Sequence, residues 1–288
     1  MTKLLICPSE RNAVQFLAQR TPLASVPLLG QCVLEYWLSS LAIQGAKKVV
    51  ILAHDRPEIT MDVVGGGERW GLEATVLPES RELTVAEALL KYSEELEEPV
   101  PAQEDIIILD RLPGASQQPL FTGYESWFRT LRHWMPCALM PDRVGMNETQ
   151  PGIWKGCHAR VSPQAQLHAP CWIGQHVLVG AHAVIGPGAI LEDGCFVEPG
   201  AELKESWLGP DTFVGRFAQI RCSLAWGNTL LNWKTGSETQ VADPFLLCAV
   251  RNPRRRTSGR FKKLANLPER NKNEAGLLWK HLLLHKQG

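Results

Sequence analysis

Residues 161–202 read VSPQAQ LHAPCW IGQHVL VGAHAV IGPGAI LEDGCF VEPGAE when they are written in blocks of six. Each block begins with valine, leucine or isoleucine. The spacing fits neither a helix, with its period of about 3.6 residues, nor a simple strand, with its period of about two. Hexapeptide repeats predict a parallel β-helix. The fifth place of each block is a small residue, namely Ala165, Cys171, Val177, Ala183, Ala189, Cys195 and Ala201.

Three such blocks are expected to build one triangular coil, with the leading aliphatic residue pointing into the prism and the small residue fitting near the corner. One step of five residues separates Leu203 from Leu208, and the spacing of six then resumes at Val214 and Ile220. The pattern therefore runs from about 155 to 225 and predicts roughly four coils.

This pattern resembles the left-handed β-helix of the hexapeptide-repeat transferases. The resemblance implies a homotrimer, because a solenoid is marginally stable alone and proteins of this family associate through the flat faces of the prism. It also implies a turn histidine that acts as general base, with an acyl-CoA such as acetyl-CoA along the cleft between subunits.

The segment upstream of the repeats alternates apolar strands with amphipathic helices. Strands are expected at 47–53 and 105–110, and helices at 33–45 and at 84–98, where Thr84 is the predicted N-cap. This βαβ order predicts a parallel sheet with helices on its faces.

The same segment resembles the N-terminal half of the sugar-1-phosphate nucleotidyltransferases, a family that includes the bifunctional uridylyltransferase/glucosamine-phosphate acetyltransferase. The stretches VPLLG (26–30), VLEYWL (33–38) and WGLEATVLPES (70–80) carry the resemblance. It implies a truncated GT-A-like (Rossmann-like) α/β domain over 1–150. A left-handed β-helix over 151–248 and a basic segment with a C-terminal helix over 249–288 complete the expected organisation.

The loop that would cradle nucleotide phosphates in that family departs from the family pattern. Its equivalent is Ser9-Glu10-Arg11-Asn12-Ala13, which lacks the glycines that let a backbone approach phosphate closely, and the family's lysine falls on Leu23. The resemblance places Ser9, Arg11 and Asp110 in substrate binding, with Asp110 also as a Mg²⁺ ligand. The alternative for Asp110 is a solvated residue at the end of a strand.

The candidate catalytic residues of the β-helix are the turn histidines His176 and His182. His158 and His176 are 18 residues apart, so we expect them to stack in one column at about the strand spacing of 4.8 Å. His182 should lie on a different edge. The alternative is that these are solvated turn residues without a catalytic or metal-binding role.

The stretch 226–243 resembles the segment that ends the coil in nucleotidyltransferases of this type. In one interpretation Asn232 and Lys234 bind substrate by lining a phosphate or acyl-CoA pocket. In the other, the stretch is a final coil in which Asn232 bonds the backbone.

Composition limits the class of protein. The 288 residues carry 30 basic and 30 acidic side chains, and this balance argues against a nucleic-acid or membrane partner. No targeting segment or long apolar run is evident, so we expect a cytoplasmic protein. The eight cysteines are not expected to form a disulfide scaffold, and Cys171 and Cys195, at the small inward places of the repeat, are expected to be buried free thiols. The run 251–263 is strongly basic, and 273–285 is expected to form an amphipathic cap helix.

Together these patterns predict a role in sugar-nucleotide or cell-envelope polysaccharide metabolism, with a nucleotide-sugar or sugar phosphate as partner. The first hypothesis is a divergent sugar-1-phosphate nucleotidyltransferase with a degenerate phosphate loop. Arg11, Arg20 or Lys47 would then replace its missing cations. The alternatives are a hexapeptide-repeat acyltransferase and a non-catalytic oligomeric scaffold or regulatory partner.

Overall fold

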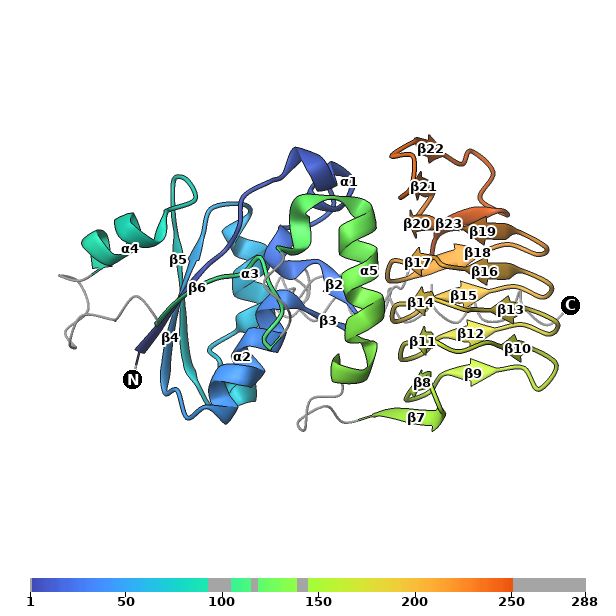
Figure 1. Ribbon diagram of the computed structural model, residues 1–288, viewed down its shortest axis with the longest axis horizontal. Coiled ribbons are helices and arrows are strands. Elements are labelled where there is room, and N and C mark those ends of the chain that lie inside the picture. The colour runs from blue at the N-terminus through green and yellow to red at the C-terminus, as the bar shows by residue number, and fades with distance from the viewer. Residues whose placement is uncertain (1, 93–104, 115–118, 139–144, 251–288) are drawn as a thin grey trace, which may run out of the picture. The chain divides into compact units, whose positions relative to one another are not determined.

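The computed structural model describes residues 2–92, 105–114, 119–138 and 145–250 (Figure 1). Residues 1–250 form one compact unit. The predicted basic run 251–263 and cap helix 273–285 lie outside the described residues, as does the end of the helix predicted over 84–98.

The N-terminal part is built on a parallel four-stranded sheet, as predicted. Its strand order is β5 (Glu73–Pro78), β4 (Lys48–Ala53), β1 (Thr2–Ile6), β6 (Ile106–Ile108). The inner strands β1 and β4 contain continuous apolar runs, LLI at 4–6 and VVILA at 49–53, which are buried because both faces of the sheet are covered there.

Helices cover this sheet (Figure 1). The expected N-cap of α4 is confirmed, since Thr84 Oγ1 accepts the Glu87 N–H at 3.3 Å and the Glu87 carboxylate accepts the Thr84 N–H at 2.9 Å. The helices are α1 (Gln15–Ala18), α2 (Val33–Ile43), α3 (Pro57–Val64), α4 (Val85–Tyr92) and α5 (Tyr124–Trp134). A short hairpin, β2 (Pro27–Leu28) and β3 (Gln31–Cys32), precedes α2.

The hexad region forms a parallel β-helix, which confirms the main prediction from the repeats. Figure 1 shows its short strands stacked one above another. The first stack is β8 (Ile153–Gly156), β11 (Cys171–Ile173), β14 (Ala189–Leu191), β17 (Trp207–Leu208) and β20 (Ser223–Trp226). The second is β9 (Arg160–Val161), β12 (Leu178–Val179), β15 (Phe196–Val197) and β18 (Thr212–Val214). The third is β10 (Gln166–Leu167), β13 (Val184–Ile185), β16 (Glu202–Lys204) and β19 (Gln219–Arg221).

The interior of the prism is filled as the sequence predicts. Among the small residues, Cys171, Val177, Ala183, Ala189, Cys195 and Ala201 are fully buried. Burial raises the pKa of the Cys171 thiol to about 12, so this thiol stays protonated and unreactive at neutral pH. All eight cysteines are free.

The stretch 226–243 does not continue the coil, so the prediction of a final coil was wrong. Strand β20 turns back through Gly227 and Asn228 into the antiparallel β21 (Thr229–Asn232), which pairs in turn with β22 (Glu238–Gln240). A two-residue Gly-Asn loop is a hairpin signal, and Gly227 takes a φ of 62° there. Two further antiparallel strands are β7 (Met146–Gln150) on β8 and β23 (Leu247–Ala249) on β18.

One face of the prism is covered by the N-terminal part of the chain. The outward side chains of the first stack lie in register and are all buried, namely Trp154, Trp172, Ile190, Trp207 and Leu224. They share one hydrophobic core with the N-terminal helices. Trp127 of α5 meets Trp207 edge-on at 5.3 Å between ring centroids.

A buried carboxylate joins the two parts. Glu192, in the β-helix, accepts the N–H groups of Leu29 and Gly30 at 2.6 Å each. It also accepts the Trp207 indole N–H at 2.9 Å. Leu29 and Gly30 both have positive φ, at 54° and 78°, and this turn of the β2–β3 hairpin points two successive N–H groups at one anion.

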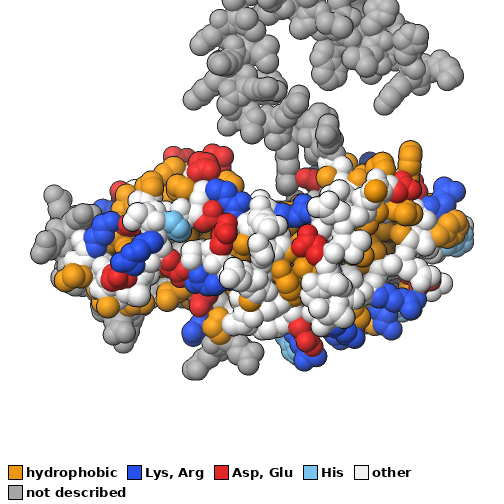
Figure 2. Space-filling model, turned by 90° about the horizontal axis from the view of Figure 1, so that it is seen from above, with side chains coloured by type: hydrophobic (Ala, Val, Ile, Leu, Met, Phe, Trp, Pro, Cys, Tyr) orange, Lys and Arg blue, Asp and Glu red, His pale blue; other side chains and the backbone are white. Residues whose placement is uncertain are grey.

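The face seen in Figure 2 carries charged side chains of both signs among hydrophobic ones. Of the helices that the structure describes, none has the length and hydrophobicity needed to cross a membrane.

Candidate functional site

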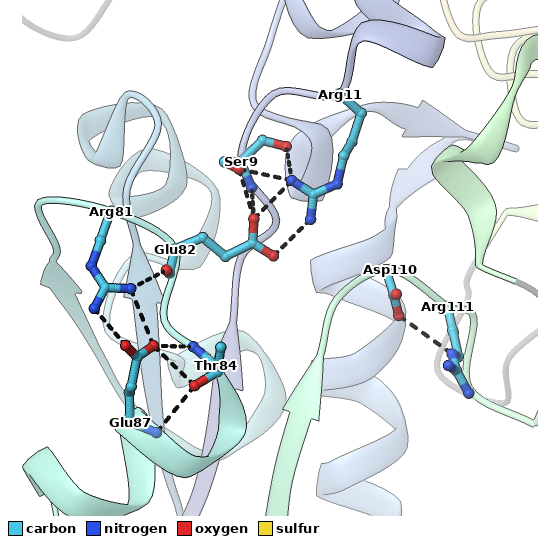
Figure 3. A network of polar contacts seen from close by, with 8 residues as sticks. All are labelled: Ser9, Arg11, Arg81, Glu82, Thr84, Glu87, Asp110 and Arg111. Atoms are coloured by element: carbon cyan, nitrogen blue, oxygen red, sulfur yellow. Dashed lines mark hydrogen bonds and ion pairs between the residues drawn. The ribbon is translucent and has the colours of Figure 1, made fainter.

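Three of the predicted site residues lie at the carboxyl edge of the N-terminal sheet. Ser9 and Arg11 follow β1, and Asp110 follows β6. The chain runs from β1 outward to β4 and β5 and then returns to the other side of β1, so β1 and β6 flank the point where strand order reverses. Ligands of open α/β sheets bind in the crevice at such a point. Figure 3 shows these side chains with Glu82.

The loop after β1 holds a carboxylate of its own chain. Glu82 accepts the Ser9 backbone N–H at 2.9 Å and the Ser9 hydroxyl at 2.6 Å. The Arg11 guanidinium donates to both Glu82 oxygens, at 2.7 and 2.8 Å (Figure 3). These are the donors a phosphate would use. Burial alone would raise the pKa of Glu82, but the hydrogen bonds from Arg11 and Ser9 outweigh it and lower that pKa to about 2.

The sequence analysis did not identify Glu82, because this residue lies 71 positions from Arg11. Its signal was only a polar run, Glu79-Ser80-Arg81-Glu82, after a strand. Arg20 does not supply a cation to this loop: its guanidinium donates to Thr229 at 2.7 Å and lies over the rings of Phe16 and Trp226.

Asp110 does not by itself make a metal centre. Its carboxylate is 3.4 Å from the Arg111 Nε, and burial raises its pKa. Within the described ranges, no three His, Cys, Asp or Glu side chains converge to hold a metal. The described residues alone do not supply enough ligands for Mg²⁺; a bound phosphate would have to provide the others. The role of Asp110 as a Mg²⁺ ligand therefore stays a prediction.

The histidine column of the β-helix has the predicted geometry. The rings of His158 and His176 stack with centroids 5.0 Å apart and planes 9° apart. His182 stands in the next turn, between β12 and β13. All three are exposed and have positive φ, at 59°, 56° and 59°, a left-handed conformation that histidine tolerates better than most residues.

An apolar pocket of about 400 Å³ lies on the second stack of strands. His176 precedes β12 and His182 follows it, and both residues of β12 line the pocket. The outward side chains of this stack, Leu178, Phe196 and Phe213, are not part of the core that the described N-terminal residues share with the first stack. The other lining residues include Arg160, Val161, Phe196, Val197 and Pro199.

Asn232 and Lys234 have separate environments. Asn232 Oδ1 accepts the backbone N–H groups of Lys234 and Thr235, at 2.9 and 3.2 Å, so it bonds the backbone as the second interpretation holds. The Lys234 side chain instead lines a groove of about 510 Å³ with Arg129, Arg132 and His133 of α5. The sequence analysis did not single out these α5 residues, because they lie about a hundred positions from Lys234.

The predicted residues therefore fall into three places: the edge of the N-terminal sheet, the open face of the β-helix, and the groove beside α5. Lys234 belongs to the third place, whereas Asn232 bonds the backbone of the loop that carries Lys234. No contact among the described residues joins either of them to His176 or Asp110.

Comparison with known proteins identifies one segment. A family model described as bacterial transferase hexapeptide (six repeats) matches residues 170–205. No curated protein sequence matches the chain. Two solved structures, both variants of GDP-perosamine N-acetyltransferase from Caulobacter crescentus in complex with CoA and GDP-perosamine, are similar at 14% identity and a TM-score of 0.19. Each alignment covers 63% of this chain and 94% of the other. The chain thus combines a hexapeptide-repeat transferase region with an N-terminal parallel α/β sheet.

Proposed function

We propose that the protein transfers an acyl group from an acyl-CoA to an amine or hydroxyl of a nucleotide-sugar or sugar phosphate, on the open face of its β-helix. The observation that carries the proposal is the position of His176 and His182 on either side of β12, which lines the apolar pocket. Both histidines and most of that pocket lie within the matched residues 170–205. An apolar groove suits the uncharged pantetheine arm of an acyl-CoA.

The reaction needs one base. The imidazole of His176 or His182 takes a proton from the acceptor as its nitrogen or oxygen attacks the thioester carbonyl carbon. The carbon–sulfur bond then breaks, and the proton passes to the departing CoA thiolate. The products are the acylated sugar and free CoA. A positioned base of this kind contributes about 10²- to 10⁴-fold in rate.

Association of copies would complete the pocket. The outward side chains Leu178, Phe196 and Phe213 lie in register on the open face, and the two phenylalanine rings stack at 5.6 Å. A homotrimer built through such faces would bring His182 of one copy toward the pocket of the next. Light scattering should give three times the chain mass, and a monomer at all concentrations would rule out a shared site.

Asparagine at His176 or His182 is expected to lower the rate of acyl transfer about 100-fold. Asparagine is the appropriate replacement because it also tolerates the positive φ of these turns, so the fold is kept. The matched control is His168→Asn, since His168 is an exposed histidine that lies between β10 and β11 and not beside β12, the strand that lines the pocket. The measurement is release of free CoA thiol from acetyl-CoA with a panel of amino-sugar acceptors. Unchanged rates in both variants would refute the proposal and favour a scaffold.

A second candidate is nucleotide or nucleotide-sugar binding at the edge of the N-terminal sheet. Its support is the placement of Ser9, Arg11 and Asp110 where the strand order reverses. The Glu82 carboxylate occupies the donors that a phosphate would need.

Replacing Glu82 with alanine is therefore expected to tighten binding of UTP at least about tenfold, because the donors of Ser9 and Arg11 are released. Calorimetric titration of the wild type and of Glu82→Ala measures this effect. The double variant Glu82→Ala with Arg11→Ala should bind UTP no more tightly than the wild type, because the guanidinium donors are then absent. If Glu82→Ala binds UTP no better than the wild type, this edge is a structural ion pair and the second candidate falls.

A further inference from the structure

A groove of about 510 Å³ lies where the last turns of α5 meet the corner of the β-helix beside Trp233. Arg129, Arg132 and His133 contribute to it from α5. These residues stand three and four positions apart, so they share one face of the helix. Lys234 lines the groove from the loop between β21 and β22. The groove is separate from the histidine pocket and from the sheet edge described above.

Helix stability explains only part of this basic cluster. Cations in the last turn of a helix interact favourably with its dipole, which accounts for Arg132 and His133. It does not account for Lys234, which comes from another element about a hundred residues away. Lys234 Nζ lies 5.4 Å from the centre of the Trp233 ring, and no carboxylate among the described residues pairs with it.

The wall that carries Lys234 is fixed in place. Trp233 is only 7% exposed, its indole N–H donates to the Glu205 carbonyl oxygen at 3.0 Å, and its ring stacks on Phe128 at 5.1 Å. A rigid wall lowers the ordering cost when a ligand binds, because the lysine stem already rests on a fixed surface.

One carboxylate of the protein, that of Glu205, lies among these cations. Glu205 Oε1 is 3.3 Å from Arg132 Nη1, a loose contact on a half-buried pair. Arg129 is held by Glu125 one turn earlier, at 2.6 Å, but both side chains are largely exposed and such a pair contributes little. The groove thus brings three permanent cations against two carboxylates, Glu205 in its lining and Glu125 beside it, so Lys234 supplies its net positive charge.

We infer that this groove binds the phosphate group of a small phosphorylated molecule, a sugar phosphate or nucleotide in size. The net positive charge favours an anionic ligand, which would compete with the weakly held Glu205 and Glu125 for the two arginines. Arginine forks match phosphate oxygens in pairs, and Lys234 supplies a point charge from the opposite wall. The volume falls within the range of small-molecule sites.

The experiment is calorimetric titration of the full chain with inorganic pyrophosphate at constant ionic strength. The test variant is Lys234→Glu. The matched control is Arg221→Glu, because Arg221 is an exposed cation paired with Glu202, as Arg132 is with Glu205, but lies outside the groove. Both variants make the same change of charge, so a general electrostatic effect would weaken both equally.

Saturable binding to the wild type is expected, weakened at least about tenfold by Lys234→Glu and changed less than about twofold by Arg221→Glu. Lys234→Gln should fall between the wild type and Lys234→Glu. Titrations with glucose 1-phosphate and with adenosine 3′,5′-bisphosphate, which represents the phosphorylated end of CoA, distinguish a sugar phosphate from an acyl donor as the source of the phosphate. Absence of saturable pyrophosphate binding, or equal weakening by both charge reversals, would overturn the inference. Neither outcome depends on acyl transfer.

Discussion

Replacing Trp207 with alanine is expected to lower the free energy of unfolding by about 4 to 6 kcal/mol. Trp207 is fully buried and contacts Trp127 and Trp226 edge-on, at 5.3 and 5.6 Å. Truncation leaves a cavity between the β-helix and α5. It also removes the indole N–H that Glu192 accepts, so a buried carboxylate loses a donor.

The control is Ile43→Ala. Ile43 is an aliphatic residue at the end of α2 and is 62% exposed, so we expect a loss of less than about 1 kcal/mol. Urea denaturation followed by both tryptophan fluorescence and circular dichroism measures the two effects. Equal losses in the two variants would mean that the covered face is not a shared core.

The stability of the protein is expected to fall by about 2 to 3 kcal/mol as the pH rises from about 5 to 8, through the titration of Glu192. Burial raises the pKa of Glu192 from its ordinary value of 4.5 to about 7, and the nearby Asp193 adds to this rise. The hydrogen bonds from Trp207, Gly30 and Leu29 oppose it. The folded state therefore holds a proton that the unfolded state releases. This contribution is fully present below the unfolded pKa and is lost as the pH rises through the folded one.

Glu192→Gln tests this assignment, because it keeps the size of the side chain but does not titrate. The amide group of the introduced glutamine would place a donor against a backbone N–H, so the variant should be less stable than the wild type at pH 5. Its free energy of unfolding should also change less than that of the wild type between pH 5 and 8. Urea midpoints at four pH values measure the slope. The pKa of Glu82 is lowered to about 2, so its titration reduces the stability of the protein only as the pH falls below about 4.5. It therefore does not contribute to the change expected between pH 5 and 8. A slope unchanged by Glu192→Gln would assign the dependence to other groups.

The β-helix could be predicted because its rule is local and repeated. The aliphatic residue of each hexad and the column of His158 and His176 follow from counting alone. The outward tryptophans were equally periodic, with Trp154 and Trp172 one coil apart. Their spacing shows that they point outward from the prism. It does not show what covers them, because the contacts of helix α5 with these tryptophans follow no repeat in the sequence.

The polar pairings could not be predicted, because they join residues far apart in the chain. Arg11 meets Glu82 across 71 positions, and Glu192 meets Leu29 across 163. In each case the carboxylate binds a loop whose N–H groups are aimed by turn geometry. The grouping of Arg129 and Lys234 has the same origin, since the junction of α5 with the β21–β22 loop creates it. The sequence analysis therefore identified the elements carrying the candidate sites more reliably than the partners of their side chains.

The most direct test of acyl transfer on the β-helix is a thermal melt of the purified chain against acetyl-CoA and, separately, against UTP with Mg²⁺. A ligand that binds only the folded state adds about 2.7 kcal/mol when present at 100 times its Kd. We predict a clear rise in melting temperature with acetyl-CoA and a smaller one or none with UTP, because Glu82 already accepts the N–H groups of Ser9 and Arg11 that the phosphates of UTP would need. A rise with UTP and none with acetyl-CoA would contradict this account and assign the activity to the N-terminal sheet.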